Sequence, residues 1–256
     1  MSLVIATRAE IIKNKRGAAF WMCLIGSAFI PFIYFLIYNL KPERYYERMA
    51  TDPWRSHFQE GWQGFSIMLL PIFVVLTCSL IVQVEYKNNT WKQVFASPLS
   101  TGDIFFSKYI GILVMVLFLL IMFSVFLLLA GVLTDVFHPK FTFLETKVEW
   151  GMLFRRSIKT FISLLGIISI QYWLSLRFRN FIVPIGIGLA LVVSSTIAMS
   201  WEHINKVPYA FPFLSYARTG SVSGRFLDNH EIYSLVYFVI FTVMAFLDLR
   251  FRKERG

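Results

Sequence analysis

The chain has 256 residues, of which 57% are hydrophobic and 16% are charged, and its formal net charge is +10. So high a hydrophobic fraction excludes an ordinary soluble domain and indicates a membrane protein with several spans. The basic residues are scattered near the ends of apolar runs, so the positive charge is explained by membrane topology and no nucleic-acid partner is expected.

Six apolar runs of roughly 16 to 25 uncharged residues recur along the chain, and each is close to the length that crosses a bilayer. We therefore predict an all-α integral membrane protein in which residues 1–256 form a single transmembrane domain with six membrane-spanning helices. The first run is too long, and too many basic residues precede it, for a cleavable signal peptide. The predicted spans lie near residues 17–40, 65–84, 109–133, 160–176, 180–199 and 232–249.

Residues 1–16 mix apolar side chains with Arg8, Lys13 and Lys15, which predicts an interfacial helix that leads into the first span. Lys and Arg are densest in short segments on the side of the N-terminus, so both termini are predicted to be cytoplasmic. The expected location is the inner, or cytoplasmic, cell membrane. Arg155 and Arg156, before the fourth span, oppose this orientation.

A polar stretch from Glu85 to Lys108 separates the second and third apolar runs. Within it, Thr90 and Gln93 have the spacing of a capping box, which predicts that a short stub helix begins at Trp91. Pro98 ends this helix after about two turns, and so short a helix needs a surface to dock against. The apolar side chains that share one face of the stub are Trp91, Val94 and Phe95.

A second capping box, formed by Ser100 and Asp103, predicts that the next helix begins at Thr101, before the third apolar run. If this helix continues to about Gly131, it is roughly 45 Å long, against about 30 Å of hydrocarbon. The excess length projects from the membrane as a stalk. A stub held between two stalks at a basic membrane face is suited to docking a soluble partner, although an ordinary surface loop is an equal alternative.

The residues of this stretch resemble a known family. Glu85, the tripeptide Thr90-Trp91-Lys92, Pro98 and Lys108 are similar in kind and spacing to the first cytoplasmic loop of ABC transporter permeases of the type-2 exporter class. That class includes half-size permeases of bacteriocin-immunity and peptide-antibiotic export systems. In this family the loop carries a coupling helix that sits on the ATP-binding subunit. The residues to which the resemblance assigns ATPase coupling are Glu85, Thr90, Trp91, Lys92, Val94, Phe95, Pro98 and Lys108.

Specific roles follow as hypotheses. The apolar face of the stub fills a groove of the ATPase, Lys92 contacts the rim of that groove, and an ion pair between Glu85 and Lys108 holds the stub between the stalks. The resemblance also implies a second permease, identical or paralogous, because six spans are half of what such transporters assemble. ATP and magnesium are expected only in the partner subunit, because the P-loop pattern G-x(4)-G-K-[ST] is absent from this sequence.

Other polar residues are interpreted as structural, with no catalytic, cofactor or metal site expected. Gln171 is expected to form an interhelical hydrogen bond, and Gly186 and Gly188 to allow close helix packing. The outer loops, including an aromatic stretch at 41–63 and a cap-like, non-helical stretch at 201–231, are expected to lie at the membrane surface. The histidines expected to be solvated in these loops are His57, His138, His203 and His230.

We therefore predict a non-enzymatic, membrane-spanning permease subunit of an ATP-driven exporter, embedded in the lipid bilayer. Its largely apolar and aromatic spans favour an amphipathic or hydrophobic substrate, such as a peptide antibiotic or a lipid-like molecule. A gradient-driven carrier is disfavoured, because the central thirds of the predicted spans contain no ionisable residue. A non-transporting membrane scaffold or immunity protein is the other alternative.

Overall fold

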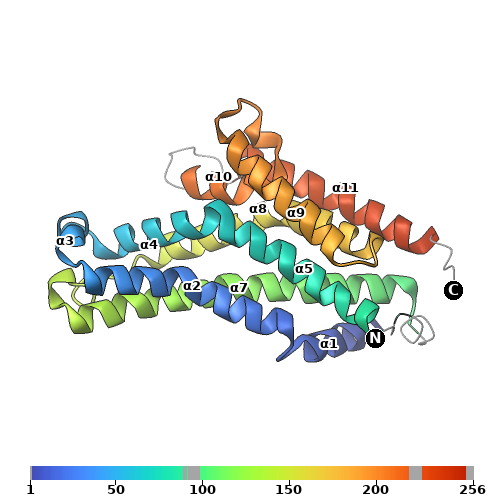
Figure 1. Ribbon diagram of the computed structural model, residues 1–256, viewed down its shortest axis with the longest axis horizontal. Helices are drawn as coiled ribbons and strands as arrows, with labels where there is room; N and C mark the ends of the chain where they lie inside the picture. The colour runs from blue at the N-terminus through green and yellow to red at the C-terminus, as the bar shows by residue number, and fades with distance from the viewer. Residues whose placement is uncertain (1, 89–90, 92–98, 219–226, 252–256) are drawn as a thin grey trace.

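The computed structural model describes residues 2–88, 91, 99–218 and 227–251 (Figure 1). Within these residues the chain is helical and has no β-strand. The long helices are α1 (Ser2–Asn14), α2 (Ala18–Leu40), α4 (Pro53–Gly64), α5 (Leu70–Lys87), α7 (Thr101–Phe137), α8 (Trp150–Arg177), α9 (Ile182–Ile197) and α11 (Asn229–Phe251). The shorter elements are α3 (Glu43–Met49), the π-helical turn η1 (Phe65–Leu69), α10 (Phe211–Arg218) and the 3-10 turns η2 (Pro139–Phe141), η3 (Ala198–Ser200), η4 (Ile204–Lys206) and η5 (Pro208–Ala210).

Six helices of the described chain are long and apolar enough to cross a membrane, and each contains or closely matches one predicted span. The all-α membrane architecture expected from the sequence is therefore confirmed. Helix α5 occupies the centre and packs against α2 and α7 on one side and against α8 and α9 on the other (Figure 1). Helix α11 packs along α8, and α1 packs along α7.

The second span is longer than predicted, because α4, η1 and α5 form one helical segment over Pro53–Lys87. Asp52 caps its start by accepting a hydrogen bond from the backbone N–H of Arg55 at 2.9 Å, and Pro53 occupies the first turn, where no N–H is needed. The aromatic side chains of α4 were expected at the membrane surface, but Trp54 is only 2% exposed. Its indole N–H donates to the carbonyl of Phe143 at 2.9 Å.

Two of the four histidines contradict the expectation of solvated loop positions. His57 lies in α4 and is fully buried, with Nε2 2.9 Å from the carbonyl oxygen of Leu127 and Nδ1 3.2 Å from the hydroxyl of Tyr38. His230, in the first turn of α11, is fully buried as well. The expectation failed because both residues belong to helices that extend beyond the apolar runs, and their buried faces become apparent only when neighbouring helices pack.

The capping box predicted for the third span is present. The backbone N–H of Asp103 donates to Ser100 Oγ at 3.0 Å, and the N–H of Ser100 donates to Asp103 Oδ2 at 3.3 Å. Helix α7 then continues to Phe137, so it is roughly 55 Å long at 1.5 Å per residue. The predicted stalk therefore exists as a helical extension, and α7 is longer than its apolar run required.

Two further helical segments lie outside the predicted spans. Residues 150–159, which precede the predicted fourth span, form the start of the continuous helix α8. The stretch at 201–231 contains α10, although no helix was expected to run through it. Pro212 is compatible with α10 because it lies at the second helical position, where the missing N–H has no intrahelical partner to lose.

Candidate functional site

The stalks that flank the predicted coupling loop, namely the end of α5 and the start of α7, are joined by a buried ion pair. Lys108 Nζ lies 2.6 Å from Glu85 Oε1, and the two side chains are 1% and 2% exposed. Glu85 is positioned by the last turns of α5, and Lys108 by the capped start of α7. The ion pair predicted between these two residues is therefore confirmed.

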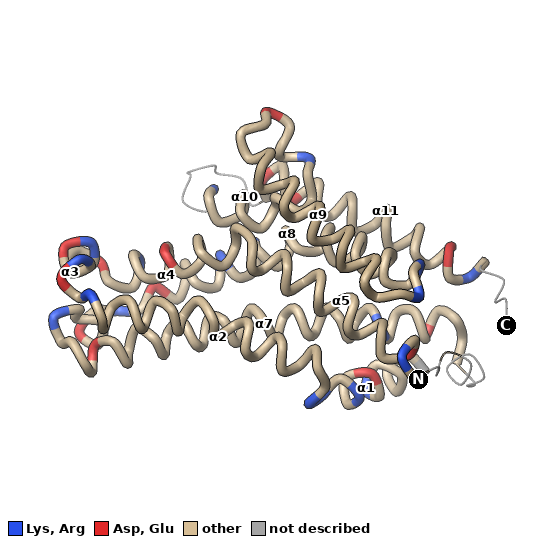
Figure 2. Tube along the Cα trace, in the orientation of Figure 1, with Lys and Arg blue, Asp and Glu red and all other residues tan. Residues whose placement is uncertain are grey.

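Helix α1 supplies two further charges to the same place. Glu10 Oε1 lies 3.1 Å from Lys108 Nζ and 2.7 Å from Lys13 Nζ, and Lys13 also pairs with Glu85. We call Glu10, Lys13, Glu85 and Lys108 the ion cluster. It contains two carboxylates and two ammonium groups, so its formal charges balance. Figure 2 shows that acidic and basic residues lie together at this end of α1, whereas the middle of the bundle is nearly free of charge.

The pKa values of Glu10 and Lys13 in α1 are shifted by the opposite charges around them. Burial raises the pKa of Glu10, but the nearby ammonium groups of Lys108 and Lys13 outweigh that effect and hold the pKa below its ordinary value. Burial lowers the pKa of Lys13, and the carboxylates of Glu85 and Glu10 more than offset it, so this pKa is raised. Both α1 side chains therefore remain charged at neutral pH and hold α1 against the stalks.

Sequence reasoning did not identify the role of Glu10. Within α1, Glu10 and Lys13 are i and i+3 neighbours, and the amide of Asn14 also donates to the carbonyl of Glu10 at 2.9 Å. The available signal was a single acidic residue in an otherwise basic N-terminal helix. That signal does not reveal a partner, because the contact to Lys108 joins segments that are far apart in the chain.

Trp91 is the residue of the predicted stub that the structure describes, and it lies against the stalks. Lys108 Nζ is 5.6 Å from the centroid of its indole ring, and the ring of Tyr86 is 5.4 Å away. The hydroxyl of Tyr86 donates to the carbonyl of Leu176 at 2.8 Å, which connects this contact to the end of α8. The indole is half-buried. Part of its surface therefore packs against this chain, and the rest is exposed.

The other predicted coupling residues lie outside the described residues. The capping box of Thr90 and Gln93, and the shared apolar face of the stub, therefore remain predictions. The positions concerned are Thr90, Lys92, Val94, Phe95 and Pro98.

Directly after Lys108 on α7, an aromatic layer connects α7 to α8. The rings of Tyr109 and Tyr172 are stacked with centroids 4.9 Å apart, and the hydroxyl of Tyr172 donates to the carbonyl of Phe105 at 3.0 Å. Large fully buried rings have few alternative positions in a close-packed interior. This layer therefore joins the start of α7 to α8 through close-packed side chains.

A second buried charged group joins α8 to the start of α11. Lys159 Nζ lies 2.8 Å from Asp228 Oδ2 and 3.5 Å from Glu231 Oε2. Glu231 Oε2 also accepts from the backbone N–H of Asp228 at 2.8 Å. This group could not be recognised in the sequence, because Lys159 precedes the predicted fourth span, whereas α8 already begins at Trp150.

The residues interpreted as packing elements behave mostly as expected. The amide of Gln171 donates to the carbonyl of Pro184 at 2.8 Å and to Ser79 Oγ at 3.2 Å, so the predicted interhelical hydrogen bond is present. Gly188 lies where a Cβ atom would meet Val75 at 2.6 Å, which confirms close packing of α9 on α5. At Gly186 no atom of the described residues lies within 4 Å of such a Cβ, so this glycine does not serve the same purpose within the described chain.

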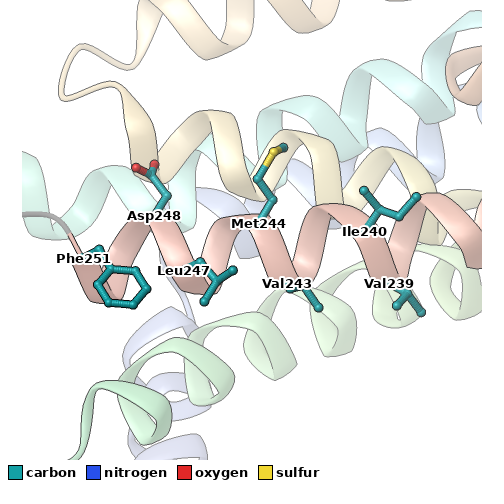
Figure 3. Close-up of a pocket in the computed structure, with 7 residues that line it drawn as sticks. All are labelled: Val239, Ile240, Val243, Met244, Leu247, Asp248 and Phe251. Carbon is teal, nitrogen blue, oxygen red and sulfur yellow. The ribbon is translucent and has the colours of Figure 1, made fainter.

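The outward surface of α11 is apolar. Figure 3 shows the residues that line a groove along this helix, among them Val239, Val243 and Leu247. Asp248, at the edge of the groove, accepts a hydrogen bond from Arg177 at 3.0 Å and thereby links the ends of α11 and α8. An apolar helix surface of this kind is suited to lipid. No group of three or more His, Cys, Asp or Glu residues that could hold a metal ion occurs in the described part of the chain.

Comparison with known proteins adds independent information. A protein family described as "ABC-2 family transporter protein" matches residues 6–195 of this chain. The Bacillus subtilis (strain 168) protein named "Uncharacterized protein YhcI" is 24% identical over 197 residues, which make up 70% of this chain and 63% of the relative. The chain therefore spans less than two thirds of the length of that relative. The family match includes most of α1, both stalks and the loop between them.

Proposed function

Because this chain belongs to the ABC-2 family of transporter proteins, we propose that it is a membrane transport permease driven by a separate ATP-binding subunit, which docks on the loop between Glu85 and Lys108. The observation that carries this proposal is the ion cluster at the base of the loop. It joins the stalks of α5 and α7 through the almost completely buried pair of Glu85 and Lys108, and it joins both to α1 through the partly buried Glu10 and Lys13. A force applied to the loop therefore acts on three helices together.

Family membership supports the ATP-driven mechanism, since ABC-2 permeases normally work with an ATP-binding subunit. In the proposed cycle, ATP binding brings two such subunits together and the loop moves with them. The stalks, held by the ion cluster, transmit this motion to α8 through the layer of Tyr109 and Tyr172. A path between this permease and a second copy or paralogue then opens outward. ATP and magnesium are bound by the partner subunit, and this chain is the non-catalytic component.

The proposed substrate is amphipathic or hydrophobic, such as a peptide or a lipid-like molecule. The apolar outward surfaces of α9 and α11 support this choice, because they offer no fixed charges along most of their length. The proposed location is the cytoplasmic membrane with both termini inside the cell. This orientation places the loop and the ion cluster on the side where ATP is available.

Affinity purification of the tagged permease from native membranes tests the proposal. An ATP-binding-cassette subunit is expected to co-purify in stoichiometric amount with the wild-type chain, and its recovery should fall at least about tenfold in the double variant Trp91→Ala/Phe95→Ala, since aromatic anchors dominate many interfaces. The matched control is Trp150→Ala/Phe154→Ala. These residues have the same types and spacing but are exposed at the start of α8.

Three outcomes would contradict the proposal. If the Trp91→Ala/Phe95→Ala variant retained the ATPase as well as the control did, the loop would not be the docking site. If a well-folded wild-type preparation transported substrate in vesicles under an ion gradient without ATP, the gradient-driven carrier would replace the proposed function. Absence of any transport or ATPase partner would favour the scaffold or immunity protein.

A further inference from the structure

Arg156, in α8, is a buried cation without a counter-ion among the described residues. Its exposed fraction is 7%, and its Nε and Nη1 atoms have no hydrogen-bond partner. The guanidinium carbon lies 5.6 Å from the centroid of the Tyr216 ring, which belongs to α10. A cation–π contact covers one face of the guanidinium plane. It does not provide a hydrogen-bond acceptor for the Nε and Nη1 donors at the edge of that plane.

The other buried cations of the described chain are neutralised. Lys108 pairs with Glu85 and Glu10, and Lys159, one turn after Arg156 on α8, pairs with Asp228 and Glu231. No carboxylate of the described chain lies within 4.0 Å of Arg156. Glu149 at the N-cap of α8 is exposed, so water screens its charge. Burial of a charge without a partner is costly, which makes Arg156 an exception that calls for a ligand.

The sequence of residues 219–226, which follow α10, contains no aspartate or glutamate, so that stretch cannot supply the missing negative charge. Tyr216 is itself fixed, because its hydroxyl donates to Gln63 Oε1 of α4 at 3.3 Å. Arg156 of α8 therefore lies against Tyr216 of α10, which is bonded to the end of α4, and it forms no ion pair with an acidic side chain of the described chain. Exposed Arg55, also on α4, is close enough to add positive potential there.

We propose that Arg156 is the anchor of an anion-binding site between α8, α10 and α4 that takes a phosphate-type group. A guanidinium group presents paired N–H donors that match two oxygens of one phosphate, and this geometry is favoured over the single charge of an ammonium group. The group can be supplied by the head of an anionic phospholipid or by free phosphate, which share this chemistry. The site is separate from the ion cluster and does not depend on the proposed ATPase coupling.

Thermal unfolding of the purified full-length chain in an uncharged detergent tests the site. The probes are phosphatidylglycerol, phosphatidylcholine and inorganic phosphate, each titrated separately. Phosphatidylglycerol is expected to raise the unfolding temperature of the wild type, and Arg156→Gln should require at least about tenfold more of it for the same shift. The matched control is Arg155→Gln, which removes the same charge from the exposed neighbouring position and should behave as wild type.

The probes distinguish the two sources. A shift with phosphatidylglycerol alone assigns the site to a lipid head group, and an Arg156-dependent shift with inorganic phosphate assigns it to a free anion. An equal response of Arg156→Gln and Arg155→Gln, or no response of the wild type to either anion, would overturn the proposal.

Three further variants guard against misfolding of Arg156→Gln. Arg156→Lys keeps the charge but lacks the paired donors, so it should bind phosphatidylglycerol more weakly than wild type and more tightly than Arg156→Gln. Tyr216→Leu removes the ring that orients the guanidinium group and should also weaken binding, whereas Tyr216→Phe keeps the ring and should not. Identical binding by all four variants would show that Arg156 does not hold the anion.

Discussion

The ammonium group of Lys108 lies 2.6 Å from Glu85 and 3.1 Å from Glu10, so one buried cation joins α7 to both α5 and α1. Its side chain is 1% exposed. The ammonium group therefore has almost no contact with water. The carboxylates of Glu85 and Glu10 are what stabilise its positive charge inside the protein.

Removal of the cation should therefore destabilise the protein strongly. In Lys108→Met the carboxylates of Glu85 and Glu10 share only Lys13, and we expect the free energy of unfolding to fall by about 3–5 kcal/mol. The double variant Glu85→Gln/Lys108→Met should recover part of this loss, because Glu10 and Lys13 then balance each other. Thermal or denaturant unfolding measures both effects. The control Arg48→Met breaks an exposed pair with Glu60 and should change stability by less than about 1 kcal/mol.

The docking of α1 should depend on pH in a defined direction. The pKa of Glu10 is lowered in the folded state, so its contribution is present above the unfolded pKa and is lost as the pH falls through the folded value. The pKa of Lys13 is raised, so its contribution is complete below the unfolded pKa and is lost as the pH rises through the folded value. We expect the wild type to exceed Glu10→Gln in unfolding temperature near neutral pH, with the difference shrinking in acid. A difference independent of pH would contradict this assignment.

Two glycines of α9 should respond in opposite ways to the same substitution. In Gly188→Ala the new methyl group would lie 2.6 Å from Val75 and 2.8 Å from Gln171 Oε1, so α9 has to move away from α5 and we expect a loss of about 1–3 kcal/mol. In Gly186→Ala the methyl group meets no atom of the described residues within 4 Å, and a gain of up to about 1 kcal/mol is expected from helix propensity. Unfolding of the two variants side by side measures the contrast. Equal effects would show that α9 does not pack as described.

Removal of the Gln171 side chain should lower the free energy of unfolding by more than the loss of a single hydrogen bond would. It donates to the carbonyl of Pro184 at 2.8 Å, and its own carbonyl accepts from the hydroxyl of Tyr209 at 3.2 Å. In Gln171→Leu the buried hydroxyl of Tyr209 loses its acceptor, and the carbonyl of Pro184 and Ser79 Oγ each lose a donor, so we expect a loss of at least about 1–3 kcal/mol. Tyr209→Phe, added to Gln171→Leu, should cost less than it does alone, because the hydroxyl has already lost its acceptor. Strictly additive losses in the double-mutant cycle would argue against the contact.

Features that depend on neighbouring residues in the chain could be predicted from the sequence. Apolar runs of sufficient length predicted the six spans, and the spacing of Ser100 and Asp103 predicted the start of α7. The ion pair of Glu85 and Lys108 could also be predicted, because both residues flank one loop and face each other when the flanking helices are antiparallel. These features involve short separations or a simple length rule, so little information about packing is needed.

The tertiary structure alone decided which polar side chains are buried and what they meet. Nothing local identifies Glu10 as a partner of Lys108, His57 as a buried residue or Arg156 as a cation without a counter-ion. Burial of a polar group depends on whether a distant helix supplies a partner and excludes water. The sequence therefore determined the membrane-spanning helices and the loop that joins the stalks. The packing of α1, α4, α8 and α10 determined where the charges are enclosed.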